Sequence, residues 1–135
     1  CVGDTPFVRG AELPAGEFAA LFVDCADSTR AGDRLAARFT APFAGFDHHL
    51  SNPLFATHNF LDTASAATCE ILAGIFFDAK LLVDATTAQA LYVGLSTDTG
   101  QFRFHSTTRR TLGDKLMVII SIKPPPLVPF AWQLR

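Results

Sequence analysis

The sequence predicts one α+β domain, in which a long helix packs against an antiparallel sheet of about five or six strands. Apolar residues recur at helical spacing over residues 59–77, and β-rich segments lie on both sides of that stretch. The length of 135 residues suits one domain, and 49% hydrophobic residues suffice for a buried core. We therefore expect residues 1–135 to form a single domain, with residues 1–16 and 124–135 at its periphery.

The first third of the chain predicts a β-hairpin. Residues 17–24 are bulky and apolar, and residues 34–43 alternate in polarity, so each segment predicts a strand. Turn-forming residues lie between them at 28–33. Residues 43–58 combine aromatic side chains, histidines and Pro53, which predicts a structured loop before the helix.

The helix and three later strands complete the predicted fold. The helix over residues 59–77 has Asp62 in its first turns, where the helix dipole favours an anion. Residues 88–96, 101–106 and 115–123 are rich in β-forming residues and predict strands that follow it. A mostly apolar helix of this kind is expected to be wrapped by a curved sheet.

Composition excludes several function classes. The net charge is −2 and no lysine or arginine patch is dense enough to follow a phosphate backbone, so no nucleic-acid partner is expected. No apolar stretch reaches the roughly 18 residues that a membrane span requires, so no membrane partner is expected either. Cys1, Cys25 and Cys69 match no zinc-binding spacing, and their odd number favours a reducing cytoplasm.

Residues 47–62 are the most informative part of the chain. They hold three of the four histidines and a sharp Asn52-Pro53 turn, and they end in the carboxylate of Asp62. Ionisable groups beside so much apolar sequence cost desolvation free energy, which indicates a functional site.

This stretch resembles the active-site signature of the β-hydroxyacyl-acyl-carrier-protein dehydratases, single-domain enzymes of bacterial fatty-acid synthesis with the hot-dog fold. Their signature G-H-F-P-G-N-P-V-M-P-G aligns without a gap with residues 47–57 (DHHLSNPLFAT). His48 falls on the family's histidine and Asp62 on its acid. Shorter similarities extend the resemblance over roughly residues 18–123, and the chain departs from the pattern at Ser51, Thr57 and Ala66.

The resemblance implies a dehydratase that removes water from a 3-hydroxyacyl thioester to give the trans-2-enoyl thioester. It assigns His48 as the base and Asp62 as the acid, two roles that a neutral imidazole and a carboxyl group in an apolar site can perform. Backbone N–H groups at Thr57 or His58 would stabilise the oxyanion, and no metal or organic cofactor is required. The other implied substrate-binding residues are Asn52, Pro53, Phe55 and Phe102.

Two alternatives share the same predicted scaffold. A hot-dog acyl thioesterase would direct water at the carbonyl group with Asp62. A non-catalytic domain that binds acyl chains is favoured by Ser51 and Thr57, which stand where the family has glycine. The resemblance also implies an acyl thioester substrate linked to acyl carrier protein or coenzyme A, and at least a homodimer.

Overall fold

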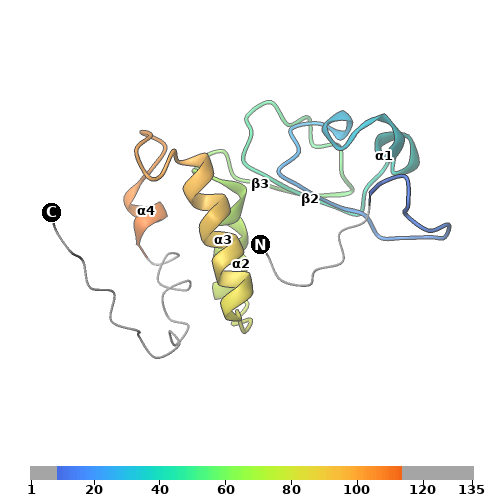
Figure 1. Ribbon diagram of the computed structural model, residues 1–135. Coiled ribbons are helices and arrows are strands. Elements are labelled where there is room, and N and C mark those ends of the chain that lie inside the picture. The colour runs from blue at the N-terminus through green and yellow to red at the C-terminus, as the bar shows by residue number, and fades with distance from the viewer. Residues whose placement is uncertain (1–8, 114–135) are drawn as a thin grey trace, which may run out of the picture.

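The computed structural model describes residues 9–113, which fold into a small sheet with helices around it (Figure 1). The strands are β1 (Leu21–Val23), β2 (Ala44–Asp47) and β3 (His58–Leu61). A 3-10 helix, η1, covers Ser28–Ala31, and the helices are α1 (Asp33–Arg38), α2 (Thr68–Asp78), α3 (Ala85–Asp98) and α4 (Arg109–Leu112).

The sheet is parallel throughout its described part, with β2 in the centre and the strand order β1-β2-β3. Phe22 pairs with Gly45, and Phe46 pairs with Phe60, whose ring it stacks against at a centroid distance of 4.7 Å. The predicted antiparallel sheet of five or six strands around one long helix, and with it the hot-dog fold, is therefore wrong. Because the strands are parallel, their carboxyl ends meet at one edge of the sheet.

A helix replaces the second strand of the predicted hairpin. The prediction of a strand within residues 17–24 is confirmed by β1, but residues 33–38 form α1. Their sequence, DRLAAR, consists largely of strong helix formers, with an acidic residue in the first turn and a basic one in the last. The helix carries the chain back past the sheet, so β2 runs parallel to β1 rather than antiparallel.

Only the second half of the predicted helix over residues 59–77 is helical. Residues 59–61 belong to β3, and α2 begins only at Thr68. Between them the Asp62 carboxylate accepts a hydrogen bond from the N–H of Ala64 at 3.1 Å, and the Asp62 carbonyl accepts one from the N–H of Ser65 at 3.1 Å. Local hydrogen bonds of this kind stabilise a turn in competition with the helix.

The second half of the chain is helical where strands were predicted. Residues 88–96 lie inside α3, whose first turn is capped by the Asp84 carboxylate accepting from the N–H of Thr87 at 2.7 Å. Residues 101–106 form turns, and the strand predicted over residues 115–123 lies outside the described residues. Strand-forming composition was outweighed here by the aspartate cap and by alanine and leucine on the buried face of α3.

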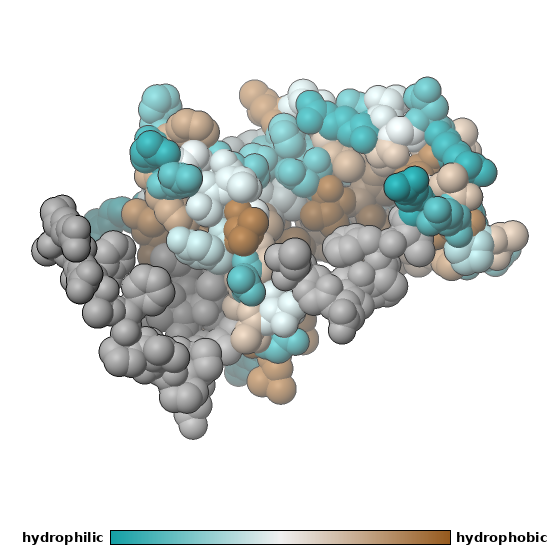
Figure 2. Space-filling model, viewed as in Figure 1, coloured by the Kyte–Doolittle hydropathy of each residue, from teal (hydrophilic) through white to brown (hydrophobic). Residues whose placement is uncertain are grey.

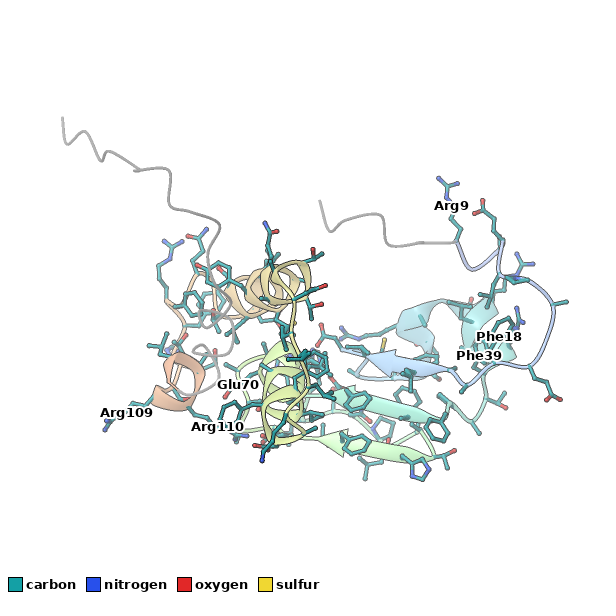
Figure 3. All side chains as sticks on the ribbon, turned by 90° about the horizontal axis from the view of Figure 1, so that it is seen from below. Arg9, Phe18, Phe39, Glu70, Arg109 and Arg110 are labelled. Atoms are coloured by element: carbon teal, nitrogen blue, oxygen red, sulfur yellow. The ribbon has the colours of Figure 1, made fainter. Side chains whose placement is uncertain are left out.

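Helices α2 and α3 lie side by side at one end of the sheet, and α1 lies toward the other end (Figures 1 and 3). The core between α2 and α3 is apolar, with Ala73, Leu91 and Leu95 buried. On the face drawn in Figure 2, hydrophilic residues gather over the end of the molecule that carries α1. Within residues 9–113, no helix has the length and apolar character needed to cross a membrane.

Candidate metal centre

Acidic and histidine side chains meet at the carboxyl edge of the sheet. Asp24 directly follows β1, Asp47 is the last residue of β2, and His48 and His49 follow it. Asp98, the last residue of α3, reaches the same place. The crevice outside the carboxyl ends of parallel strands is the usual ligand site in α/β proteins.

The distances between these groups suit a bound cation. His48 Nε2 lies 3.5 Å from Asp24 Oδ1 and 3.8 Å from Asp98 Oδ2. His49 Nδ1 lies 3.9 Å from Asp24 Oδ1. One ligand atom each from Asp24, His48 and His49 fall within 4.8 Å of one another. Imidazole nitrogens and carboxylate oxygens are ligands of divalent transition metals.

The backbone and one hydroxyl orient Asp24. Its φ of 60° lies in the left-handed region, which aspartate tolerates better than most residues. Its N–H donates to the carbonyl of Phe46 at 2.9 Å, which ties it to β2. Its Oδ1 accepts a hydrogen bond from the Thr68 hydroxyl, at the start of α2, at 2.8 Å. The carboxylate is therefore held toward the histidines from two sides.

Asp47 is buried and orients its neighbours. Its Oδ1 lies 2.7 Å from His49 Nδ1 and accepts from the N–H of His48 at 2.8 Å, and its Oδ2 accepts from the Asn52 amide at 2.7 Å. Burial alone would raise the pKa of Asp47, but the hydrogen bonds from His49, Asn52 and the backbone together hold it below its ordinary value. The carboxylate is thus fixed in its charged form at the base of the site.

The surroundings of Asp98 disfavour its charged form. Burial, followed by the nearby Asp24 carboxylate, raises the pKa of Asp98, and the opposing influence of His48 and His49 does not cancel this. Two carboxylates that face one imidazole leave an excess of negative charge in the cluster. A divalent cation would offset that charge, so the electrostatics and the geometry favour the same occupant.

The ring of His48 is oriented by a backbone carbonyl. Its Nδ1 lies 3.3 Å from the carbonyl oxygen of Ser65, which can only accept a hydrogen bond. In the neutral ring this carbonyl favours the tautomer with hydrogen on Nδ1 and a lone pair on Nε2, the nitrogen that faces Asp24 and Asp98. This is the usual arrangement of a metal-binding histidine.

The structure brings His48 and Asp62 close to Ser65, yet no hydrogen bond or ion pair joins the two side chains in the described part of the chain. Asp62 Oδ2 instead accepts from the Ser65 hydroxyl at 2.9 Å and from Arg110 at 2.8 Å. His48 faces Asp24 and Asp98. The two predicted residues therefore have different partners, His48 at the carboxyl edge of the sheet and Asp62 in the turn beside it.

The backbone donors proposed for an oxyanion are already engaged. The N–H of Thr57 donates to the Pro42 carbonyl at 2.8 Å, and the N–H of His58 donates to the Phe43 carbonyl at 3.0 Å. Both belong to the approach to β3 rather than to a helix mouth, and His58 is exposed. This geometry offers no oxyanion site at these positions.

The remaining predicted residues have structural contacts. Asn52 donates to Asp47 and, at 3.2 Å, to the carbonyl of Cys25, so the Asn52-Pro53 turn holds the ends of β1 and β2 together. The ring of Phe55 packs edge-on against the buried Phe22. The ring centroids of Phe102 and Tyr92 lie 6.0 Å apart.

An apolar groove lies beside β1 rather than between the predicted phenylalanines. Its lining includes Leu13, Phe18, Leu35 and Phe39. Figure 3 shows the rings of Phe18 and Phe39 next to each other beside α1. Phe55 and Phe102, which were predicted to bind substrate, are not part of the lining of this groove.

Sequence reasoning missed Asp24, Asp47 and Asp98. Asp24 and Asp47 each end an apolar strand, a signal that identifies a shared site only when the strands are known to be parallel. Asp98 was placed near a predicted strand, and only as the end of α3 does it reach the histidines.

Known proteins are similar to about half of this chain. No family model matches the chain. A Mycoplasma pneumoniae protein named bifunctional oligoribonuclease and PAP phosphatase NrnA is 37% identical over 67 residues, which cover 49% of this chain and 21% of the relative. The protein of the same name from Thermus thermophilus is 35% identical over 75 residues, covering 53% and 23%. The similar segment thus spans less than a quarter of each relative.

These similarities overturn the dehydratase prediction. The relatives are named for oligoribonuclease and phosphatase activities, not for removal of water from a 3-hydroxyacyl thioester. The expected acyl thioester substrate, the acyl-carrier-protein partner, the place in fatty-acid synthesis and the exclusion of nucleic acid are wrong. The thioesterase and acyl-binding alternatives and the homodimer rested on the hot-dog fold, and their basis is removed with it.

Proposed function

We propose that this chain is a metal-dependent phosphoesterase that acts on short oligoribonucleotides and on PAP. The observation that carries the proposal is the group of Asp24, His48 and Asp98 at the carboxyl edge of the sheet, with His49 beside it. The names of the two relatives supply the substrate class. The proposal departs from the sequence-based expectation that no metal is needed.

Asp24, Asp98 and Nε2 of His48 are the groups that would hold the ion. Their atoms face one another, and the Ser65 carbonyl favours the His48 tautomer whose Nε2 carries no hydrogen. A divalent ion bound here would polarise a phosphoryl oxygen and lower the pKa of a coordinated water.

His49 has a different position in the site. Its Nδ1 lies 2.7 Å from Asp47 Oδ1, so the buried carboxylate accepts the Nδ1 hydrogen and orients the ring. The ring is 31% exposed, so Nε2 is accessible to a phosphate. We assign His49, with its hydrogen on Nδ1 and a lone pair on Nε2, as the base that takes a proton from the attacking water.

The test combines a metal and two substrates. The full chain is incubated with Mn²⁺ and a short oligoribonucleotide or PAP, and release of mononucleotide or inorganic phosphate is measured. We expect release that EDTA abolishes and that Asp24→Asn and His48→Ala reduce to background. Asp84→Asn, in the cap of α3, is the control and should retain activity. Release that is unchanged in Asp24→Asn would overturn the assignment.

The cytoplasm stays the expected compartment. Within the described residues, Cys25 and Cys69 are free thiols, as is usual for proteins in a reducing environment.

A further inference from the structure

We propose that Arg110 is a positioning residue for His48, acting through Asp62 and Ser65. The inference rests on the proposed function, because His48 is positioned for a metal ion. It adds a role for α4, which contributes no side chain to the cluster of Asp24, His48 and His49.

The first step is the contact between Ser65 and His48. The Ser65 carbonyl sets both the direction of the ring and the nitrogen that carries the hydrogen. Ser65 is 4% exposed, so bulk water does not compete with its carbonyl for Nδ1 of His48. Any movement of the Ser65 peptide therefore changes the direction of His48 Nε2 relative to Asp24.

The second step is the turn that holds Ser65. Ser65 donates to Asp62 twice, from its N–H to the carbonyl at 3.1 Å and from its hydroxyl to Oδ2 at 2.9 Å. The N–H of Ala64 donates to Oδ1 of the same carboxylate. Burial would raise the pKa of Asp62, but these hydrogen bonds and Arg110 together hold it below its ordinary value. Asp62 therefore stays charged and organises the turn.

The third step is the guanidinium of Arg110. One of its terminal nitrogens donates to Asp62 Oδ2 at 2.8 Å, and its Nε lies 3.6 Å from Glu70 Oε1. Glu70 is fully buried, and its Oε1 has no hydrogen-bond partner within residues 9–113. The other oxygen of Glu70 accepts from the N–H of Ala66 and from the hydroxyl of Thr111. A single arginine thus links carboxylates on both sides of Ser65.

Figure 3 shows how α4 places this arginine. The side chain of Arg110 is turned toward Glu70, whereas the adjacent Arg109 points away from the molecule. A capping box between Thr108 and Thr111 fixes the start of α4, and Thr111 is buried. Arg109 therefore has the same charge and almost the same position along the chain as Arg110, without its contacts to the turn.

The experiment compares Arg110→Ala with Arg109→Ala in the metal-free full chain. Nitrogen-15 NMR of the histidine rings reports which nitrogen of His48 carries the hydrogen, independently of any hydrolysis. We expect the wild type and Arg109→Ala to hold the hydrogen on Nδ1, and Arg110→Ala to show a mixture of tautomers. Mn²⁺ affinity measured by calorimetry should fall by about 10-fold or more in Arg110→Ala alone. Arg110→Lys, which keeps the charge but not the fork, should recover part of the loss.

The outcomes separate this inference from the proposed function. A His48 tautomer and Mn²⁺ affinity that are unchanged in a folded Arg110→Ala protein overturn the positioning role. Loss of hydrolysis with an unchanged tautomer in Arg110→Ala also overturns it. If Arg110→Ala changes the His48 tautomer but the wild type never hydrolyses phosphoesters, the positioning role is intact and the proposed function is overturned instead. If Arg110→Ala does not fold, Arg110→Gln takes its place; unfolding of both variants would make Arg110 a structural residue and overturn the proposal.

Discussion

Gly94 of α3 lies directly against the sulfur of Cys69 on α2. A β-carbon built at Gly94 would overlap Cys69 Sγ and lie 3.4 Å from its Cβ. Asp98 stands one helical turn beyond Gly94, so the close approach of the two helices also determines where Asp98 meets His48.

The Gly94→Ala variant tests this contact. In an exposed helix the change would stabilise the protein by about 1 kcal/mol, because alanine is the better helix former. Here the added methyl group must displace α3 or Cys69, and overpacking of this kind typically costs about 1–3 kcal/mol. We expect a net loss of stability in urea unfolding and weaker Mn²⁺ binding, because Asp98 moves with α3.

A second substitution separates the clash from other effects of the alanine. The Cys69→Ala change removes the sulfur, so the double variant should recover most of the stability lost in Gly94→Ala, beyond the sum of the single changes. If Gly94→Ala is as stable as the wild type and the double variant shows no coupling, the close contact is not limiting.

The fold was predictable only in part because the local pattern of the second predicted strand was ambiguous. The short alternation over residues 34–43 suits a strand, yet residues 33–38 are strong helix formers and became α1. That single element changed the sheet from antiparallel to parallel, and it brought Asp24 and Asp47 to one edge. The prediction singled out His48, but its neighbours in space come from the end of β1 and from α3, which spacing within residues 47–62 cannot show.

Metal binding should stabilise the fold. A ligand that binds only the folded state at 100 times its dissociation constant adds about 2.7 kcal/mol, which for a chain of this size corresponds to roughly 5–15 °C in Tm. We expect Mn²⁺ to raise the Tm of the wild type and EDTA to reverse the shift. Asp24→Asn should lose the shift, while the matched Asp84→Asn keeps it. An equal shift in both variants would contradict the assigned ligands.

Arg38 connects α1 by hydrogen bonds to residues 13–16, which precede β1. Its guanidinium donates to the carbonyls of Leu13, Pro14 and Gly16 at 3.4, 2.7 and 3.2 Å, and it lies 5.3 Å from the ring centroid of Phe18. Arg38→Ala should therefore loosen this segment by about 1–2 kcal/mol.

Hydrogen exchange measured by mass spectrometry checks the effect. Amides over residues 9–20 should exchange faster in Arg38→Ala, whereas Arg34→Ala, on the same helix, should match the wild type. Mn²⁺ affinity should not change in either variant, because neither residue contacts the cluster. Faster exchange across α2 and α3 as well would show that Arg38 supports the whole fold instead.

Asp47 should make the protein sensitive to acid. Hydrogen bonds hold its pKa below the ordinary value in the folded state, despite the opposing effect of burial. A folded-state pKa below the unfolded value of about 3.9 contributes stability that is present above that pH and is lost as the pH falls through the folded-state pKa. We expect the free energy of unfolding, measured in urea at several pH values below about 5, to fall with decreasing pH.

In Asp47→Asn the stability at neutral pH should be lower by about 2 kcal/mol, because His49 and Asn52 lose a charged acceptor, and its decline in acid should be shallower. Parallel pH curves for the two proteins would mean that Asp47 is not the group whose protonation weakens the fold.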